Sequence, residues 1–118
     1  METKREKGKG WIGVDLDGTL AHYTSFKGED HVGAPIEPMV RRVRAWLHEG
    51  RDVRLFTARR ASPAIRRWMR EHLGVILPIV NTKDQHMQML LDDRAVQVQR
   101  NTGKVREDDM AQVLWSRS

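Results

Sequence analysis

The feature that most constrains this fold is the alternation of short apolar segments with longer amphipathic ones. Short runs rich in β-branched residues predict strands, and they occupy residues 11–16, 52–57 and 75–80. Between them, apolar residues recur every three or four positions, which predicts helices over 36–49 and from Pro63 to Gly74. Strands that alternate with helices form βαβ units with right-handed crossovers. We therefore predict an α/β fold: one Rossmann-like three-layer domain whose mainly parallel sheet is covered on both faces.

The remaining segments are less regular, and we assign them from local patterns. Residues 24–35 hold glycine, proline and polar residues without a period, which predicts a loop. Pro78 lacks a backbone N–H, so the pairing of the third strand is expected to begin after it. The rest of the chain predicts a short helix, two short strands and a closing helix, over 84–89, 89–93, 95–98 and 107–115.

Composition narrows the class of protein. At 118 residues the chain has room for one domain, which we place at 11–118, after a basic and flexible N-terminus at 1–10. The chain holds no cysteine, which excludes disulfides, thiolate metal sites and a cysteine nucleophile. No apolar run reaches the roughly 20 residues of a membrane span, and we expect a cytoplasmic protein without a membrane partner. The formal charge of +5 favours anionic partners, although the arginine-rich stretches are also typical of solvated helix faces.

Polar residues follow the predicted strands, where parallel sheets bind their ligands. Asp15 and Asp17 follow the first strand, and the two-residue period of a strand places both on one side. The other strand ends carry a hydroxyl, an amine and two more carboxylates: Thr57, Lys83, Asp92 and Asp93. Carboxylates that meet in a low-dielectric crevice need a cation, and oxygen ligands favour Mg²⁺. Each of these residues taken singly also fits a turn or a surface position, so the prediction depends on the whole set.

Four segments, VDLDGTL, RLFTAR, NTKD and LLDDR, resemble in this order the motifs of the haloacid dehalogenase (HAD) superfamily of phosphohydrolases. The resemblance runs from Trp11 to about Val98, and its first motif is highly specific. It implies that Asp15 is the nucleophile that forms an aspartyl-phosphate, and that Asp17 is the general acid and then the base.

The same resemblance implies the ligands of the substrate and the metal. The phosphoryl group would be bound by the second and third motifs, through Thr57, Ala58, Arg59 and Lys83. Mg²⁺ would be held by Asp15, the backbone carbonyl of Asp17, Asp92 and Asp93. The segment FTAR departs from the pairing more usual in the superfamily, and Arg59 equally fits a surface role.

The short spacing between the motifs resembles that of small capless members of the superfamily, whose open crevice tends to admit bulky substrates or to borrow a lid from a neighbouring subunit. The triplet Asp92–Arg94 and the first motif also resemble the 3′-phosphatase domain of polynucleotide kinase-phosphatases. The overall pattern is most similar to small phosphatases of phage and bacterial genomes. Three residues in or near the loop at 24–35 are candidates to stack on a base: His22, Tyr23 and His31.

The residues and the resemblance together predict a Mg²⁺-dependent phosphomonoester hydrolase. Its partner would be a phosphorylated small molecule or a nucleic-acid end, so that a nucleotidase and a polynucleotide 3′-phosphatase both fit. The alternative is an inactive basic module that kept the fold and binds nucleic acid or a protein. Transfer of the phosphoryl group to an acceptor other than water also stays open, as do the exact substrate and the choice between monomer and dimer.

Overall fold

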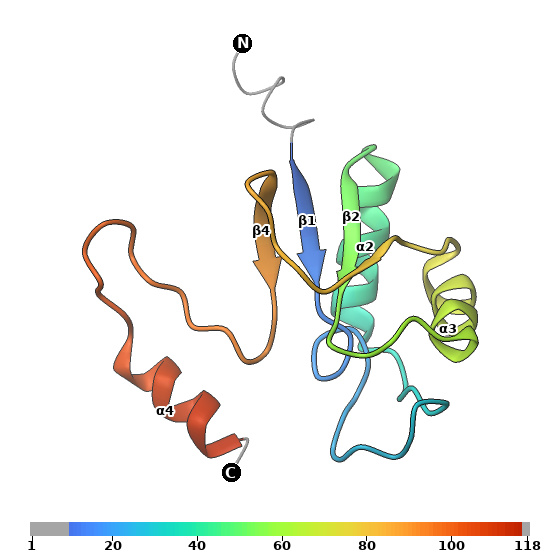
Figure 1. The fold of residues 1–118 in the computed structure, drawn as a ribbon, viewed down its shortest axis with the longest axis horizontal. Coiled ribbons are helices and arrows are strands. Elements are labelled where there is room, and N and C mark those ends of the chain that lie inside the picture. The colour runs from blue at the N-terminus through green and yellow to red at the C-terminus, as the bar shows by residue number, and fades with distance from the viewer. Residues whose placement is uncertain (1–9, 117–118) are drawn as a thin grey trace.

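A four-stranded parallel sheet organises the chain, in the strand order β3-β2-β1-β4. The computed structural model describes residues 10–116 (Figure 1). The strands are β1 (Trp11–Val14), β2 (Asp52–Phe56), β3 (Ile79–Val80) and β4 (Met87–Leu91). The helices are α2 (Glu37–His48), α3 (Pro63–Leu73) and α4 (Glu107–Ser116). The predicted α/β fold is confirmed, and no cap domain lies between residues 10 and 116; residues 1–9 of the predicted flexible N-terminus lie outside the described residues.

The strand β1 is central, because it pairs in parallel with β2 on one side and with β4 on the other. In this register Val14 lies opposite both Leu55 and Leu91. The carboxyl ends of the three strands therefore reach the same edge of the sheet. The predicted pairing of β3 only after Pro78 is confirmed, since that strand begins at Ile79.

Helix α3 begins and ends where its flanking residues predict. The side chain of Ser62 accepts a hydrogen bond from the backbone N–H of Ile65 at 3.2 Å, and Pro63 occupies the first turn. At the other end, Gly74 takes the left-handed conformation with φ of 84°, which closes the last turn. Helix α2 begins one residue later than predicted, at Glu37, and also carries a proline in its first turn.

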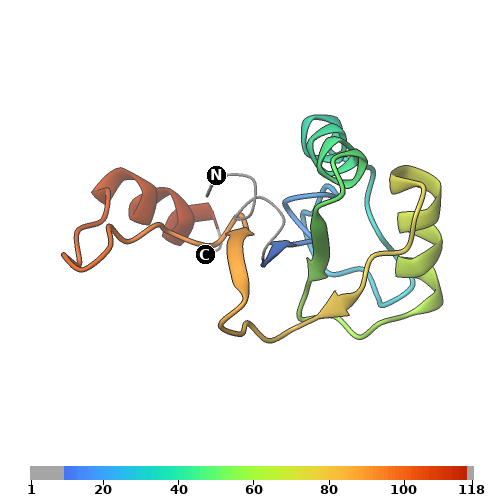
Figure 2. The ribbon, with the colours of Figure 1, turned by 90° about the horizontal axis from the view of Figure 1, so that it is seen from above.

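Helices α2 and α3 cover one face of the sheet (Figure 2). Both crossovers step in the same direction, from β1 to β2 and from β2 to β3, and right-handed connections then place both helices on one side. The core between them is fully apolar, with members from the sheet and both helices: Ile12, Val14, Val53, Leu55, Val40, Val43, Ile65, Trp68 and Met69. Burial of these side chains is the main stabilising contribution of this layer.

Within residues 10–116 the opposite face of the sheet carries no helix, unlike the predicted cover on both faces; the connection from β3 to β4 crosses it instead (Figures 1 and 2). Trp11 lies under this connection with only 1% of its surface exposed, and its indole N–H donates to Asp84 Oδ1 at 2.9 Å. The guanidinium of Arg54 lies 4.7 Å from the centroid of the same ring. Gly13 leaves space for that ring, since a Cβ there would lie 3.1 Å from it.

Two predicted elements near the C-terminus are wrong. The helix predicted over 84–89 is a loop followed by β4, and the strand predicted over 95–98 is irregular chain. Residues 89–91 are apolar in succession, and such a short run does not distinguish a buried strand from a helix. Its pairing with β1 decides the outcome, because a strand there satisfies the second edge of β1.

Helix α4 forms as predicted but lies apart from the sheet (Figure 1). Within residues 10–116, no Cα atom of α4 comes within 8 Å of a Cα atom of another helix or strand. Leu114 on this helix is 67% exposed. None of the described helices is long and apolar enough to cross a membrane.

Replacing the N-cap Ser62 by alanine is expected to destabilise the domain. The substitution leaves the N–H of Ile65 without its acceptor, which costs about 1 kcal/mol in typical helices. Thermal unfolding followed by circular dichroism should show a fall in Tm of about 3–6 °C. The control is Ser25→Ala, on the exposed loop, which should leave Tm unchanged; equal Tm values for the two variants would contradict a role for the cap.

Candidate active site

The carboxyl ends of β1, β2 and β4 place polar side chains around one cavity. Asp15 follows β1 and is still hydrogen-bonded to β4, because its N–H donates to the carbonyl of Leu91 at 2.9 Å. Leu16 is fully buried in the core. The residues on either side of it, Asp15 and Asp17, both line a cavity of about 380 Å³. Thr57 lines the same cavity from the end of β2. The structure thus brings together residues that lie more than 40 positions apart in the sequence.

Three carboxylates form a cluster at the edge of this cavity. One oxygen from each of Asp15, Asp92 and Asp93 lies within 4.8 Å of the others. The hydroxyl of Thr19 lies between two of them, 3.4 Å from Asp15 Oδ2 and 3.3 Å from Asp93 Oδ1, and accepts a hydrogen bond from the N–H of Asp93 at 3.1 Å. Because the hydroxyl has one proton, it can donate to only one carboxylate at a time. The Thr19 hydroxyl therefore holds two of the carboxylates in place but can donate its proton to only one of them.

A tight turn after β1 makes room for the cluster. The N–H groups of Leu20 and Ala21 both donate to the carbonyl of Leu16 at 2.9 Å. Gly18 within this turn has φ of 90°, and a Cβ on it would collide with the carboxylate of Asp93. Only glycine combines this backbone conformation with this close approach.

The carboxyl group of Asp15 is strongly perturbed. Its pKa is raised from 3.8 to about 7, first by burial and then by the charge of Asp92 and a hydrogen bond with Asp93. A carboxyl group that resists ionisation in this way gains most from a nearby cation. The donors are all oxygen atoms and come from three carboxylates, a set that fits a hard divalent cation such as Mg²⁺. The residues that could hold it are Asp15, Asp92 and Asp93.

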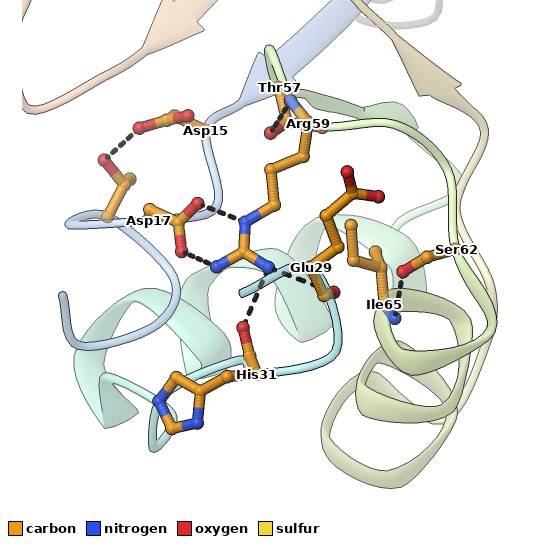
Figure 3. Close-up of polar contacts among 9 residues, drawn as sticks. Asp15, Asp17, Glu29, His31, Thr57, Arg59, Ser62 and Ile65 are labelled. Atoms are coloured by element: carbon orange, nitrogen blue, oxygen red, sulfur yellow. Dashed lines mark hydrogen bonds and ion pairs between the residues drawn. The ribbon is translucent and has the colours of Figure 1, made fainter. Parts of the chain in front are cut away.

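Asp17 faces away from this cluster and binds Arg59 (Figure 3). The pair is bidentate: Arg59 Nε donates to Asp17 Oδ2 at 2.8 Å, and Nη2 donates to Oδ1 at 2.9 Å. Only 10% of the Arg59 side chain and 19% of the Asp17 side chain are exposed, so solvent screens this pair weakly. The resemblance assigned only the backbone carbonyl of Asp17 to the metal, and its carboxylate is not part of the three-carboxylate cluster.

Arg59 also joins the cavity to the loop at 24–35. Its Nη1 donates to the carbonyl of His31 at 2.8 Å (Figure 3). The base of the same loop is tied down separately, because the indole N–H of Trp68 donates to the carbonyl of Gly33 at 2.8 Å. From the sequence, Arg59 fitted either a substrate contact or a surface role. In the structure it lines the cavity.

Of the other predicted site residues, two line the cavity and one does not. Thr57 is 3% exposed, and its hydroxyl accepts a hydrogen bond from the N–H of Arg59 at 3.1 Å; Ala58 also lines the cavity. Lys83 is exposed and does not line the cavity; it lies beyond the end of β3, in the connection that leads to β4. The structure brings together all the predicted residues at the ends of β1, β2 and β4, and leaves Lys83 outside.

Four cavity residues had no site role from sequence patterns: Phe26, Glu29, Arg60 and Arg94. Phe26 is an isolated aromatic residue in a polar loop, and Arg94 follows the acidic pair directly. Those two signals were visible in the sequence, whereas the approach of the loop to Arg59 was not.

The comparisons with known proteins concern the fold. No protein family and no curated protein matches this sequence. Among solved structures, the chain is similar to a conserved protein from Bacteroides thetaiotaomicron, with 17% identity over 94% of this chain and 93% of that chain and a TM-score of 0.53. At this identity the likeness supports the α/β architecture along almost the whole chain, and function has to be inferred from the site.

Replacing Asp15 by asparagine is expected to stabilise the domain at alkaline pH. In the wild type, the folded chain keeps a proton that the unfolded chain releases near pH 3.8, so the stability of the fold falls as pH rises from there to about 7. An asparagine side chain carries no charge at any pH, so the substitution removes that loss.

The measurement is thermal unfolding in EDTA between pH 5 and pH 8.5. The Tm of the variant should exceed that of the wild type by a few degrees at pH 8.5, and the difference should shrink towards pH 5. Asp30→Asn, which removes an exposed carboxylate, is the control and should show no such trend. A difference that does not change with pH would contradict the raised pKa.

Proposed function

We propose that this protein is a Mg²⁺-dependent phosphomonoesterase that works through an aspartyl-phosphate on Asp15. The observation that carries the proposal is the three-carboxylate cluster of Asp15, Asp92 and Asp93, in which Asp15 also lines the cavity of Thr57 and Arg59. A cluster of this kind destabilises the fold when it lacks a cation, and adjacent hydroxyl and guanidinium groups suit an anion. A cation site beside an anion site is the arrangement that phosphoryl transfer needs.

In the first step of the proposed reaction, an Asp15 carboxylate oxygen attacks phosphorus. The bond from phosphorus to the leaving oxygen breaks, and Asp17 gives its proton to that oxygen. Bound Mg²⁺ would offset the negative charge on the nucleophile and the phosphoryl oxygens. The hydroxyl of Thr57 would turn to donate to one of those oxygens. The product alcohol leaves, and the phosphoryl group stays on Asp15.

In the second step, Asp17 takes a proton from water and the resulting hydroxide attacks phosphorus. The bond between phosphorus and the Asp15 oxygen breaks, and inorganic phosphate is released with Asp17 protonated again. This assignment requires Asp17 to exchange a proton with the reacting groups. A carboxylate held bidentately by a guanidinium cannot do so.

We infer that the substrate releases Asp17 by competing for Arg59. A dianionic phosphate is a stronger partner for a guanidinium than one carboxylate is, and it presents the same two-oxygen edge. When Arg59 binds the phosphate, Asp17 is freed next to the leaving oxygen. Lys83, at the end of β3, would add its charge only if the loop after that strand moves towards the cavity.

The proposed substrate is a phosphate ester of a nucleotide or a nucleic-acid end, in the cytoplasm. The charge of +5 and the arginines in the cavity wall support an anionic substrate. The second candidate function is a binding module without turnover, and the exposed position of Lys83 outside the cavity favours it. The two functions differ in whether phosphate is released.

Phosphate release from p-nitrophenyl phosphate tests the proposal. Wild-type protein with Mg²⁺ should release phosphate, and EDTA should abolish the release. Asp15→Asn should lower kcat at least about 1,000-fold because the nucleophile is lost, and Asp17→Asn should lower it about 100-fold or more because proton transfer is lost. The matched control is Asp108→Asn on α4, which should keep full activity. Release that survives Asp15→Asn would contradict the assigned nucleophile.

Two further measurements distinguish the candidate functions: the activity of Lys83→Ala, and turnover by the wild type with different metals. In a phosphatase, loss of this charge should lower kcat/KM about 10-fold or more. No turnover in the wild type with Mg²⁺, Mn²⁺ or Co²⁺, together with salt-sensitive binding of nucleic acid, would support the binding module.

A further inference from the structure

We propose that the cavity binds the phosphorylated end of a single-stranded oligonucleotide, with Phe26 as the stacking platform for the terminal base and Arg60 and Arg94 as ligands of the next phosphate. This inference rests on the proposed phosphomonoesterase, because the terminal phosphate would occupy the site of Asp15 and Arg59. It extends that proposal to the part of the substrate that does not react.

Phe26 is, like Trp115 on α4, a strongly exposed aromatic residue. It is 61% exposed although it lines the same cavity as Asp15 and Asp17. A large exposed apolar side chain beside a polar site costs solubility and has no packing role in the core. Its other close group is the guanidinium of Arg59, which lies 5.8 Å from the ring centroid. The ring thus lies within cation–π distance of a guanidinium that also belongs to the phosphate site.

The loop that carries Phe26 is anchored at several points. At its base, the N–H of His22 donates to the carbonyl of Ala34 at 2.8 Å, and Trp68 holds Gly33 as described above. Near its middle, Arg59 holds the carbonyl of His31. A platform held in this way loses little conformational entropy when a ligand binds. Tyr23 directly precedes this loop and lines the same cavity.

The dimensions suit a nucleotide. The cavity of about 380 Å³ lies within the usual range for small-molecule sites, and it holds both the reactive carboxylates and the aromatic ring. A ligand that fills it would therefore place a planar group and its phosphate ester in the same enclosure. Bases stack on aromatic side chains in proteins that bind single strands, and each stack contributes affinity with little dependence on sequence.

Two more cations extend the site beyond one nucleotide. Arg60 comes from the segment after β2 and Arg94 from the segment after β4, and both line the cavity. Both side chains are exposed, and within the described residues neither guanidinium has a hydrogen bond or an ion pair. Cations without protein partners at the mouth of an anion site are suited to a second phosphate. Glu29 is the opposing charge in the wall, and a neutral glutamine there should strengthen binding.

The first experiment measures binding rather than turnover. Fluorescence anisotropy in EDTA gives the Kd of the protein for a labelled trinucleotide with a terminal phosphate. Phe26→Ala should raise the Kd about fivefold or more, which corresponds to the loss of one stacked base. Phe26→Tyr keeps the ring and should restore wild-type binding. Trp115→Ala is the matched control, because it removes an exposed aromatic residue of α4 that does not line the cavity, and it should leave the Kd unchanged.

The arginines are tested through the salt dependence of the same Kd. Arg60→Gln with Arg94→Gln should reduce the slope of log Kd against log salt by about 0.7, the value for one phosphate of a single strand. Arg66→Gln with Arg70→Gln, on the exposed face of α3, makes the same change in net charge and should leave the slope unaltered.

A third measurement separates this inference from the proposed phosphatase. If both hold, Phe26→Ala lowers kcat/KM for the phosphorylated trinucleotide by a clearly larger factor than kcat/KM for glycerol phosphate. Equal losses on the two substrates, or no change in Kd, would overturn the stacking site while the phosphatase stands. Conversely, phosphate-dependent binding that needs Phe26 without any turnover would support the oligonucleotide site and overturn the phosphatase.

Discussion

The rest of the structure depends on the parallel pairing of β1 with a neighbour on each side. Since β1 is followed directly by Asp15, the register of its two ladders decides what surrounds that carboxyl group. Pairing with β4 brings Asp92 and Asp93 to it, and pairing with β2 brings Thr57. A slip by one residue on either side would turn those side chains to the other face of the sheet. The apolar core under β1 and β2 resists such a slip, so the core layer holds the site in register.

The site combines two charge arrangements with opposite energetics. The three-carboxylate cluster is unfavourable without a cation, since burial and then the charge of Asp92 raise the pKa of Asp15. The pair of Asp17 with Arg59 is favourable, since it is bidentate and poorly exposed. The carboxylate cluster therefore attracts a metal cation, whereas the guanidinium of Arg59 can bind an anion. In the proposed function both arrangements change when the substrate binds, and this exchange would couple the loop at 24–35 to the reaction.

The sequence patterns predicted the elements that depend on local signals, and failed where an element depends on contacts between distant residues. Helix α3 could be predicted to within a residue because Ser62, Pro63 and Gly74 are local signals that act within a few positions. The connection after β3 could not, because its path across the sheet depends on Trp11, which binds Asp84 from 73 positions away. The short apolar run before Asp92 became a strand for the same reason, since β1 offered it an open edge.

By itself, the sequence determined the α/β class, the positions of the strand ends and the chemical groups found there. These follow from periodicity and from local turn chemistry, which the residues carry with them wherever they fold. The tertiary structure decided which of those groups lie close together. It joined Asp15 to Asp92 and Asp93, turned the carboxylate of Asp17 towards Arg59, and left Lys83 outside. Those outcomes depend on strand order and on the approach of a loop to the sheet, and both are set by contacts between residues far apart in the chain.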